Sequence, residues 1–199
     1  MSQIIKTIAA AMLAGAIVFT AGAAAAQAHA PMALVGTGAT VRIVRPGSYY
    51  LPRNLLSRLK NLPVVMVTVS NVTLNLNGNA IIGPGGSGTS VGIKTAPGVT
   101  NVAVLNGTIT NIAGTALNLG ADSEVAGVRI VNNGGDGVDC ASGCLINGNI
   151  VAENVGMGLN FGADDTSGYE NNVLNGNGGG VTGGTNLGHN VIDGVATTP

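Results

Sequence analysis

Three acidic residues in the second half of the chain have the types and spacing of a cation site. Asp164, Asp165 and Glu170 fall within one short stretch, FGADDTSGYE. Carboxylate oxygens are the ligands that Ca²⁺ takes in proteins. The stretch therefore predicts a weak calcium site, with a solvated acidic edge as the alternative. No other cofactor is expected. A zinc site needs four ligands, and the only histidines are His29 and His189, so zinc is excluded.

A second set of polar residues recurs at nearly constant spacing. Asn118, Asp139, Asn160 and Thr182 follow one another at intervals of 21, 21 and 22 residues. Such a series offers hydrogen-bond donors and acceptors at regular distances, which suits the hydroxyl groups of a sugar chain. We therefore predict that these four residues bind a ligand. Aromatic residues are scarce, so the expected affinity is modest.

The four polar residues lie at the centre of a repeated motif. The segments GTALNL, GDGVDC, GMGLNF and GGGVTG align so that apolar residues flank each polar one. One apolar column is Leu117, Val138, Leu159 and Val181, and the other is Leu119, Cys140, Phe161 and Gly183. This alternation predicts a short β-strand with one buried face. A second strand is expected upstream, where Ile130, Val151, Val173 and Val191 align.

A repeat of this length cannot bury its apolar face alone, so successive copies must stack. Stacked strands in register, about 4.8 Å apart, form a parallel β-helix. The sequence therefore predicts an all-β, single-stranded solenoid of about seven rungs, roughly 35 Å long, with the best repeats at residues 65–194. Asn and Gly suit the left-handed backbone at rung corners, and stacked Asn side chains can bond from rung to rung.

The units NVTLNLNG, NGN and PGSYYLPRNL, with the repeated glycine motif, resemble the right-handed parallel β-helix repeats of the pectin-lyase-like superfamily over residues 40–194. That resemblance implies the fold and brings hydrolase, lyase and epimerase activities into consideration. Polygalacturonase-like members carry an Asp, an Asp pair and a Gly-His unit on successive rungs. The matching positions here are Asp139, Asp164 with Asp165, and Gly188 with His189.

Three observations argue against that activity. The matched groups occupy different columns of the repeat, whereas paired carboxylates must lie within about 5 to 10 Å on one face. The flanking letters and the Arg-x-Lys substrate clamp of those hydrolases are absent. A lyase or epimerase would need a cation beside its base, and Arg129 is the only basic residue of the acidic half. No catalytic residue is therefore assigned.

Composition and charge reduce the number of possible folds and partners. The chain has 33 Gly, no Trp and 9% charged residues, which favours an all-β fold rich in turns. All acidic residues follow position 121, and no Lys or Arg follows Arg129. Because there is no arginine-rich stripe and few aromatics could stack on bases, nucleic acid is not an expected partner.

The N-terminal segment reads as a secretory signal at residues 1–28. Lys6 precedes an Ala-rich apolar run that closes on Ala26-Gln27-Ala28. The alternative is an uncleaved anchor, because the run approaches membrane-spanning length. The expected mature protein, residues 29–199, is one β-helix domain without a membrane span, secreted or periplasmic. In that setting Cys140 and Cys144 could form a disulfide.

Three segments fall outside the regular repeat. Leucines in PRNLLSRLKNLP, residues 52–63, are spaced as on a short capping helix, with an excursion loop as the alternative. GPGGSG, residues 83–88, matches a phosphate-loop pattern, but no helix is expected after it, so it predicts a loop. The tail VATTP contains no cap, which predicts a frayed last rung or self-association there.

These expectations combine into an exported, non-catalytic β-helix. Its polar sheet face would bind polysaccharide or another component of the cell envelope, or serve a structural role at the surface. The alternative is an enzyme that degrades or modifies polysaccharide.

Overall fold

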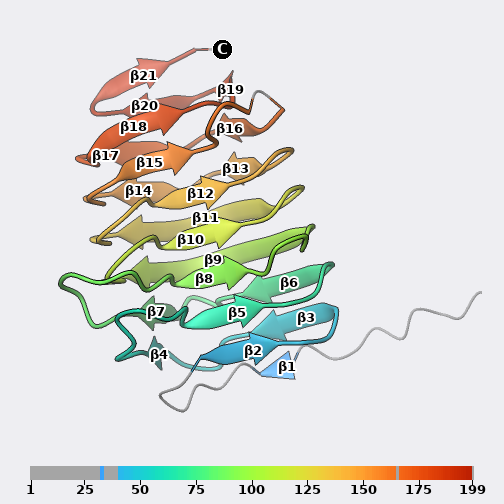
Figure 1. Cartoon of the computed structure of the whole chain (residues 1–199). Coiled ribbons are helices and arrows are strands. Elements are labelled where there is room, and N and C mark those ends of the chain that lie inside the picture. The colour runs from blue at the N-terminus through green and yellow to red at the C-terminus, as the bar shows by residue number, and fades with distance from the viewer. Residues whose placement is uncertain (1–31, 34–39, 165, 199) are drawn as a thin grey trace, which may run out of the picture.

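The computed structural model describes residues 32–33, 40–164 and 166–198, and in them it contains strands, turns and bends but no helix. The strands wind into a parallel β-solenoid of about six turns (Figure 1). The chain runs to the right along the front strands and returns behind them as it climbs, so the coil is right-handed. The predicted fold class is confirmed. The predicted signal at residues 1–28 and Asp165 lie outside the described residues.

Each full rung carries three strand segments, which stack into three faces. Face 1 is the seven-stranded sheet of β2 (Val41–Ile43), β5 (Val65–Val67), β8 (Ile93–Thr95), β10 (Leu117–Leu119), β12 (Val138–Cys140), β15 (Met157–Asn160) and β18 (Gly179–Thr182). Its seven strands agree closely with the expected rung number.

The other two faces are joined into one fourteen-stranded sheet, because β9 (Val102–Thr110) and β11 (Glu124–Val131) run through both. Face 2 also holds β1 (Met32–Ala33), β3 (Gly47–Tyr50), β6 (Val72–Asn75), β13 (Leu145–Asn147), β16 (Gly168–Glu170) and β19 (Thr185–Gly188). Face 3 also holds β4 (Leu55–Leu56), β7 (Ala80–Ile82), β14 (Ile150–Ala152), β17 (Val173–Asn175), β20 (Asn190–Ile192) and β21 (Val195–Thr197).

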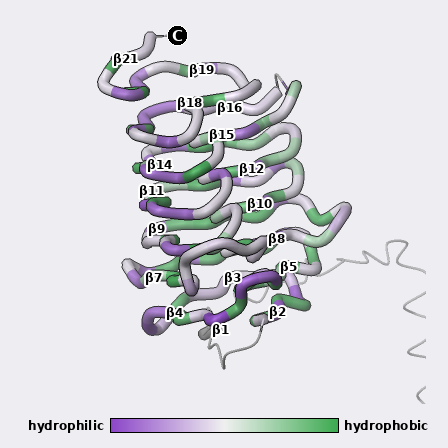
Figure 2. Tube along the Cα trace, turned by 60° about the vertical axis from the view of Figure 1, so that its left-hand side comes forward, coloured by the Kyte–Doolittle hydropathy of each residue, from purple (hydrophilic) through white to green (hydrophobic). Residues whose placement is uncertain are grey.

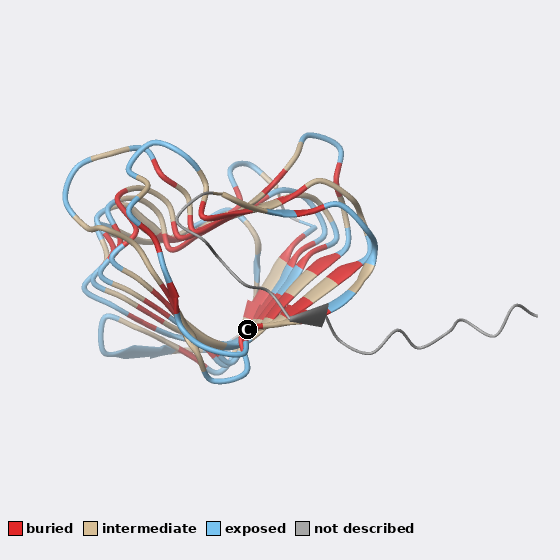
Figure 3. Cartoon of the chain, turned by 90° about the horizontal axis from the view of Figure 1, so that it is seen from below, coloured by how far each residue is buried: buried red, intermediate tan, exposed pale blue. Residues whose placement is uncertain are grey.

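The apolar columns predicted for face 1 form the core. Leu117 pairs with Val138, Val138 with Leu159, and Leu159 with Val181. The first three are fully buried, and Val181 packs against the core at the last rung. In the second column Leu119, Cys140 and Phe161 are also buried. Seen along the axis, buried and partly exposed positions alternate along the stacked strands (Figure 3). The predicted register is confirmed for this face.

The register predicted for the upstream strand is wrong in its last two members. Ile130 pairs with Val151, but Val151 pairs with Leu174 and Leu174 with Ile192. Val173 instead points outward and is 42% exposed. The corner between β17 and β18 is shorter than the one between β14 and β15. A constant offset from the next strand therefore selects the neighbour of the buried residue.

The repeated glycines of the motif are explained by close contact between rungs. A Cβ atom on Gly137 would lie 2.6 Å from the carbonyl oxygen of Gly158 in the next rung. A Cβ on Gly158 would in turn lie 2.8 Å from the carbonyl oxygen of Gly180. Any side chain there would force the rungs apart, since real Cβ atoms do not approach other atoms so closely. The motif thus marks where the stacked backbones come nearest.

Asparagines hold two corners of the solenoid together. Asn133 donates from Nδ2 to Oδ1 of Asn154 at 2.8 Å, and Asn154 donates likewise to Asn177 at 2.8 Å. A second ladder runs through Asn149, Asn172 and Asn190, with Nδ2 to Oδ1 distances of 3.0 and 3.1 Å. Hydrophilic stretches recur at the corners of successive rungs in Figure 2. The predicted bonding of Asn between rungs is confirmed, and much of it is buried.

The capping helix expected at residues 52–63 is wrong, because that segment contains strand β4, whose Leu55 pairs with Ile81 of β7. Leu55 is buried while Leu56 and Leu62 are 70% and 56% exposed, so the leucines do not share one helical face. After β4 the chain forms the irregular excursion that was the alternative. Residues 83–88 form the expected loop, and strand β8 rather than a helix follows it.

The tail was expected to leave the last rung without a cap, and this is wrong for face 3. Strand β21 folds back and pairs antiparallel with β20. On the other two faces, β18 and β19 are the last strands among the described residues, and no further strand pairs with their outer edges there. Self-association at those edges stays a prediction. No helix in the described part of the chain is long and apolar enough to cross a membrane.

Candidate functional site

The predicted polar series lies in one straight row on the outside of face 1. Asn118 pairs with Asp139, Asp139 with Asn160, and Asn160 with Thr182. The row also continues toward the N-terminal rungs, so that each of the seven strands contributes one outward residue: Arg42, Met66, Lys94, Asn118, Asp139, Asn160 and Thr182. We call this set the polar row.

A carboxylate beside the row was missed by the sequence analysis. Asn160 donates from Nδ2 to Oδ2 of Asp136 at 3.0 Å, and Oδ1 of Asp136 accepts the backbone N–H of Met157 at 2.8 Å. Within the row, Asn118 donates from Nδ2 to Oδ2 of Asp139 at 2.6 Å. Asp136 is the second letter of the motif GDGVDC, a column that otherwise holds Thr, Met and Gly. Because no other repeat has an acidic residue at this position, the repeat pattern did not identify Asp136.

The electrostatic surroundings of Asp139 oppose its ionisation. Partial burial raises the pKa of this carboxyl, and the nearby negative charge of Asp136 raises it further. The hydrogen bond from Asn118 and the positive charge of Lys94 act in the opposite direction but do not cancel the rise. An ionised Asp139 is therefore held at some cost in free energy, and the amide and ammonium groups around it reduce that cost.

This cost predicts that Asp139→Asn stabilises the protein. A raised folded-state pKa means that ionisation at neutral pH works against folding, and the amide removes that charge while its oxygen still accepts from Asn118. Water screens a half-exposed group, so we expect a gain of no more than about 1 kcal/mol at pH 7, or roughly 2–4 °C in Tm. The gain should vanish below about pH 4, where Asp139 is protonated in both states. Thermal melts of both proteins from pH 3 to 8 measure this.

The surface beside the polar row carries small side chains. Two residues further along the chain, the corresponding positions hold Ala96, Gly120, Ala141 and Gly162. These small side chains cannot cover the row from that side. An extended molecule could therefore lie along the row and contact several rungs at once.

The two predicted calcium ligands that the structure describes, Asp164 and Glu170, lie in different elements. Asp164 turns its carboxylate into its own loop, where Oδ1 accepts from Thr166 Oγ1 at 2.7 Å and Oδ2 accepts from Ser167 Oγ at 2.6 Å. These bonds lower the pKa of Asp164 to about 2, so they persist until the pH falls well below 4. Glu170 lies on β16, beyond the loop. In the described ranges no three His, Cys, Asp or Glu side chains gather as a metal site, and calcium binding stays a prediction.

The positions that match the hydrolase pattern are spread around the solenoid. Asp139 lies on face 1, Asp164 lies in the corner loop between β15 and β16, and His189 lies at the corner between β19 and β20. His189 has a φ of 57°, so it occupies a left-handed corner position. Asp165 is outside the described residues. These described positions do not share a face, as catalysis by paired carboxylates would require.

The two cysteines form a buried disulfide. Cys140 and Cys144 form a disulfide, and both are buried in the core. Cys144 occupies the corner position held by Ser123 one rung below and by Ser167 one rung above, and its backbone N–H donates to Ser167 Oγ at 3.0 Å. The disulfide thus joins the end of β12 to a corner column.

The fold and the polar row define a parallel β-solenoid with an open, hydrogen-bonding sheet face. In comparisons with known proteins, no protein-family model matches this chain, and neither a similar curated protein nor a similar solved structure was found.

Proposed function

We propose that the protein is an exported, non-catalytic glycan-binding solenoid of the pectin-lyase-like type, which contacts polysaccharide of the cell envelope or its surroundings through the polar row. The observation that supports this proposal best is the register of face 1. It aligns outward side chains from all seven strands of the sheet. Their spacing of about 4.8 Å per rung is close to the length of one sugar unit in an extended chain.

The chemistry of the row favours hydroxyl-rich ligands. Asn118, Asn160 and Thr182 offer both donors and acceptors, and Asp139 offers acceptors. Arg42 and Lys94 lie at the N-terminal end of the row, while Asp136 and Asp139 lie near its middle. A polyuronate would meet repulsion at the two carboxylates, so a neutral glycan fits the row better.

The second candidate function is glycoside hydrolysis on the same face. The observation that favours it is the position of Asp139 close to a second carboxylate, Asp136, whose negative charge adds to the effect of burial in raising the pKa of Asp139, because glycosidases use a pair of carboxyl groups. Against it, both carboxylates already accept hydrogen bonds from Asn118, Asn160 and the Met157 backbone. The row is also open rather than enclosed.

Ala141→Gln tests whether face 1 is the contact surface. Ala141 is exposed and lies two residues beyond Asp139, so glutamine adds bulk over the row without adding charge or removing a row residue. We expect binding on a glycan array, read with and without calcium, to fall about tenfold, since the added side chain displaces several polar contacts. The matched control is Ala126→Gln, on face 2. Equal binding by both variants and the wild type would show that glycans are held elsewhere.

A further inference from the structure

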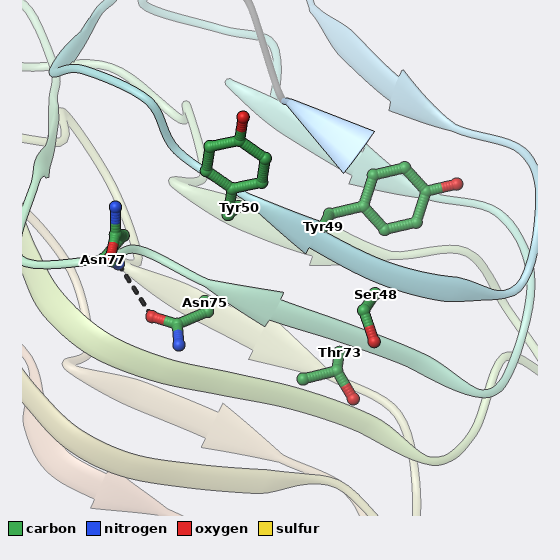
Figure 4. Close-up of a pocket in the computed structure, with 6 residues that line it drawn as sticks. All are labelled: Ser48, Tyr49, Tyr50, Thr73, Asn75 and Asn77. Atoms are coloured by element: carbon green, nitrogen blue, oxygen red, sulfur yellow. Dashed lines mark hydrogen bonds between the residues drawn. The ribbon is translucent and has the colours of Figure 1, made fainter. Parts of the chain in front are cut away.

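A pocket of about 560 Å³ lies on face 2, at the N-terminal end of the solenoid (Figure 4). Its size falls within the range of small-molecule sites, about 300 to 1,000 Å³. Its lining comes from β3, β6 and the corner that follows β6: Ser48, Tyr49, Tyr50, Thr73, Asn75 and Asn77. None of these residues belongs to the polar row, which is on face 1.

The register of two neighbouring strands builds this pocket. Ser48 pairs with Thr73 and Tyr50 pairs with Asn75, and these four side chains alternate with the buried residues Tyr49 and Leu74. The outward set therefore places one aromatic ring next to two hydroxyl groups and an amide. Tyr49 uses its hydroxyl elsewhere, donating to the carbonyl oxygen of Arg45 at 2.8 Å.

The polar groups of the pocket are available to a ligand. Within the described part of the chain, the hydroxyls of Ser48, Tyr50 and Thr73 make no hydrogen bond. Oδ1 of Asn75 accepts the backbone N–H of Asn77 at 2.8 Å, which fixes the Asn75 amide and leaves its Nδ2 free to donate. The corner residue Asn77 has a φ of 54° and adds a second amide. None of the described residues that line the pocket is charged.

We infer that this pocket binds one neutral sugar unit, with the ring of Tyr50 against the apolar face of the sugar. An aromatic ring offers a flat apolar surface, and tyrosine adds a polar tip. The hydroxyls of Thr73 and Ser48 and the amides of Asn75 and Asn77 match sugar hydroxyl groups, which both donate and accept. An anion or a cation would find no opposite charge in the lining, so uronates, phosphates and metal ions are disfavoured. The inference does not depend on face 1.

Saturation-transfer NMR and titration with the methyl glycosides of glucose, galactose, mannose and N-acetylglucosamine test this site. We expect at least one of the four to bind with a Kd on the order of millimolar. Tyr50→Ala should weaken that binding by about tenfold, because the stacking surface is removed, while Tyr50→Phe should keep it within about threefold. The control is Leu145→Ala, a change at an exposed residue of face 2 on β13, which should bind as the wild type does.

Three results would overturn the inference: no binding of any of the four glycosides, binding that Tyr50→Ala leaves unchanged, or equal binding of galacturonate. Ala141→Gln separates this site from the proposed function. That variant should bind the glycosides normally even where its binding to a long glycan is lost. Loss of glycoside binding in Ala141→Gln, with Tyr50→Ala unaffected, would assign the sugar to face 1 instead.

Discussion

Leu159→Asp is expected to abolish folding. Leu159 has no exposed surface and pairs with Val138 below it and Val181 above it. An aspartate there leaves an unpaired charge in the stacked core, which costs several kcal/mol, and it also removes packing worth roughly 2–5 kcal/mol. Together these losses match the whole stability of a typical domain, about 5–15 kcal/mol. Circular dichroism and a thermal melt should show no cooperative transition.

Val155→Asp is the matched control in the same rung. Val155 is 73% exposed, so the charge remains in water and Tm should stay within about 2 °C of the wild type. A soluble Leu159→Asp protein that melts cooperatively would contradict the assignment of this column to the core.

Asn172→Ala is expected to produce the second largest loss of stability. Oδ1 of Asn172 accepts from both the backbone N–H and Nδ2 of Asn149, each at 3.0 Å. Its Nδ2 donates to the carbonyl oxygen of Ile146 at 2.8 Å and to Oδ1 of Asn190 at 3.1 Å. All of this is buried, and alanine leaves these partners unsatisfied. We expect a loss of about 2–5 kcal/mol in the free energy of unfolding, measured by denaturant titration.

Asn175→Ala provides the comparison within the same rung. Asn175 is exposed on β17, so its removal should change the free energy of unfolding by less than about 0.5 kcal/mol. If Asn172→Ala and Asn175→Ala destabilised the protein equally, the buried ladder would not be a major source of stability.

Periodicity predicted the fold because the repeat length is nearly constant along the buried column of face 1. The spacing between Leu117, Val138 and Leu159 is the same in each rung, so the sequence alone places these residues in one column. The same reasoning failed for Val173 because the corner between β17 and β18 is shorter than the corner between β14 and β15. Corner length is set by local turn geometry, and a constant offset cannot represent it.

The helix expected at residues 52–63 failed for a different reason. Its leucine spacing matched a helical face, but Leu55 could pair with Ile81 in the stacked sheet. Tertiary pairing thus overrode a local pattern in a short segment. The C-terminal strand was missed because VATTP carries no repeat letters, although β-branched residues suit the edge position that it occupies.

The last four residues of the polar row could be predicted because they follow the repeat, whereas the first three residues and the surroundings of the row could not. The contribution of Asp136 depends on how a side chain of one rung reaches the amide of Asn160 in the next rung. The pocket around Tyr50 depends on the pairing of β3 with β6, in the irregular first repeats. Neither contact has a fixed spacing in the sequence.

We propose that the polar row binds a glycan without cleaving it. The direct measurement incubates wild type and Asp139→Asn with a polysaccharide that the protein binds, and follows both affinity and new reducing ends or unsaturated products. We expect saturable binding, no product, and a change in affinity of about 1 kcal/mol in the variant, because one polar partner replaces another. Product release by the wild type that disappears in Asp139→Asn would contradict non-catalytic binding and establish a hydrolase or lyase.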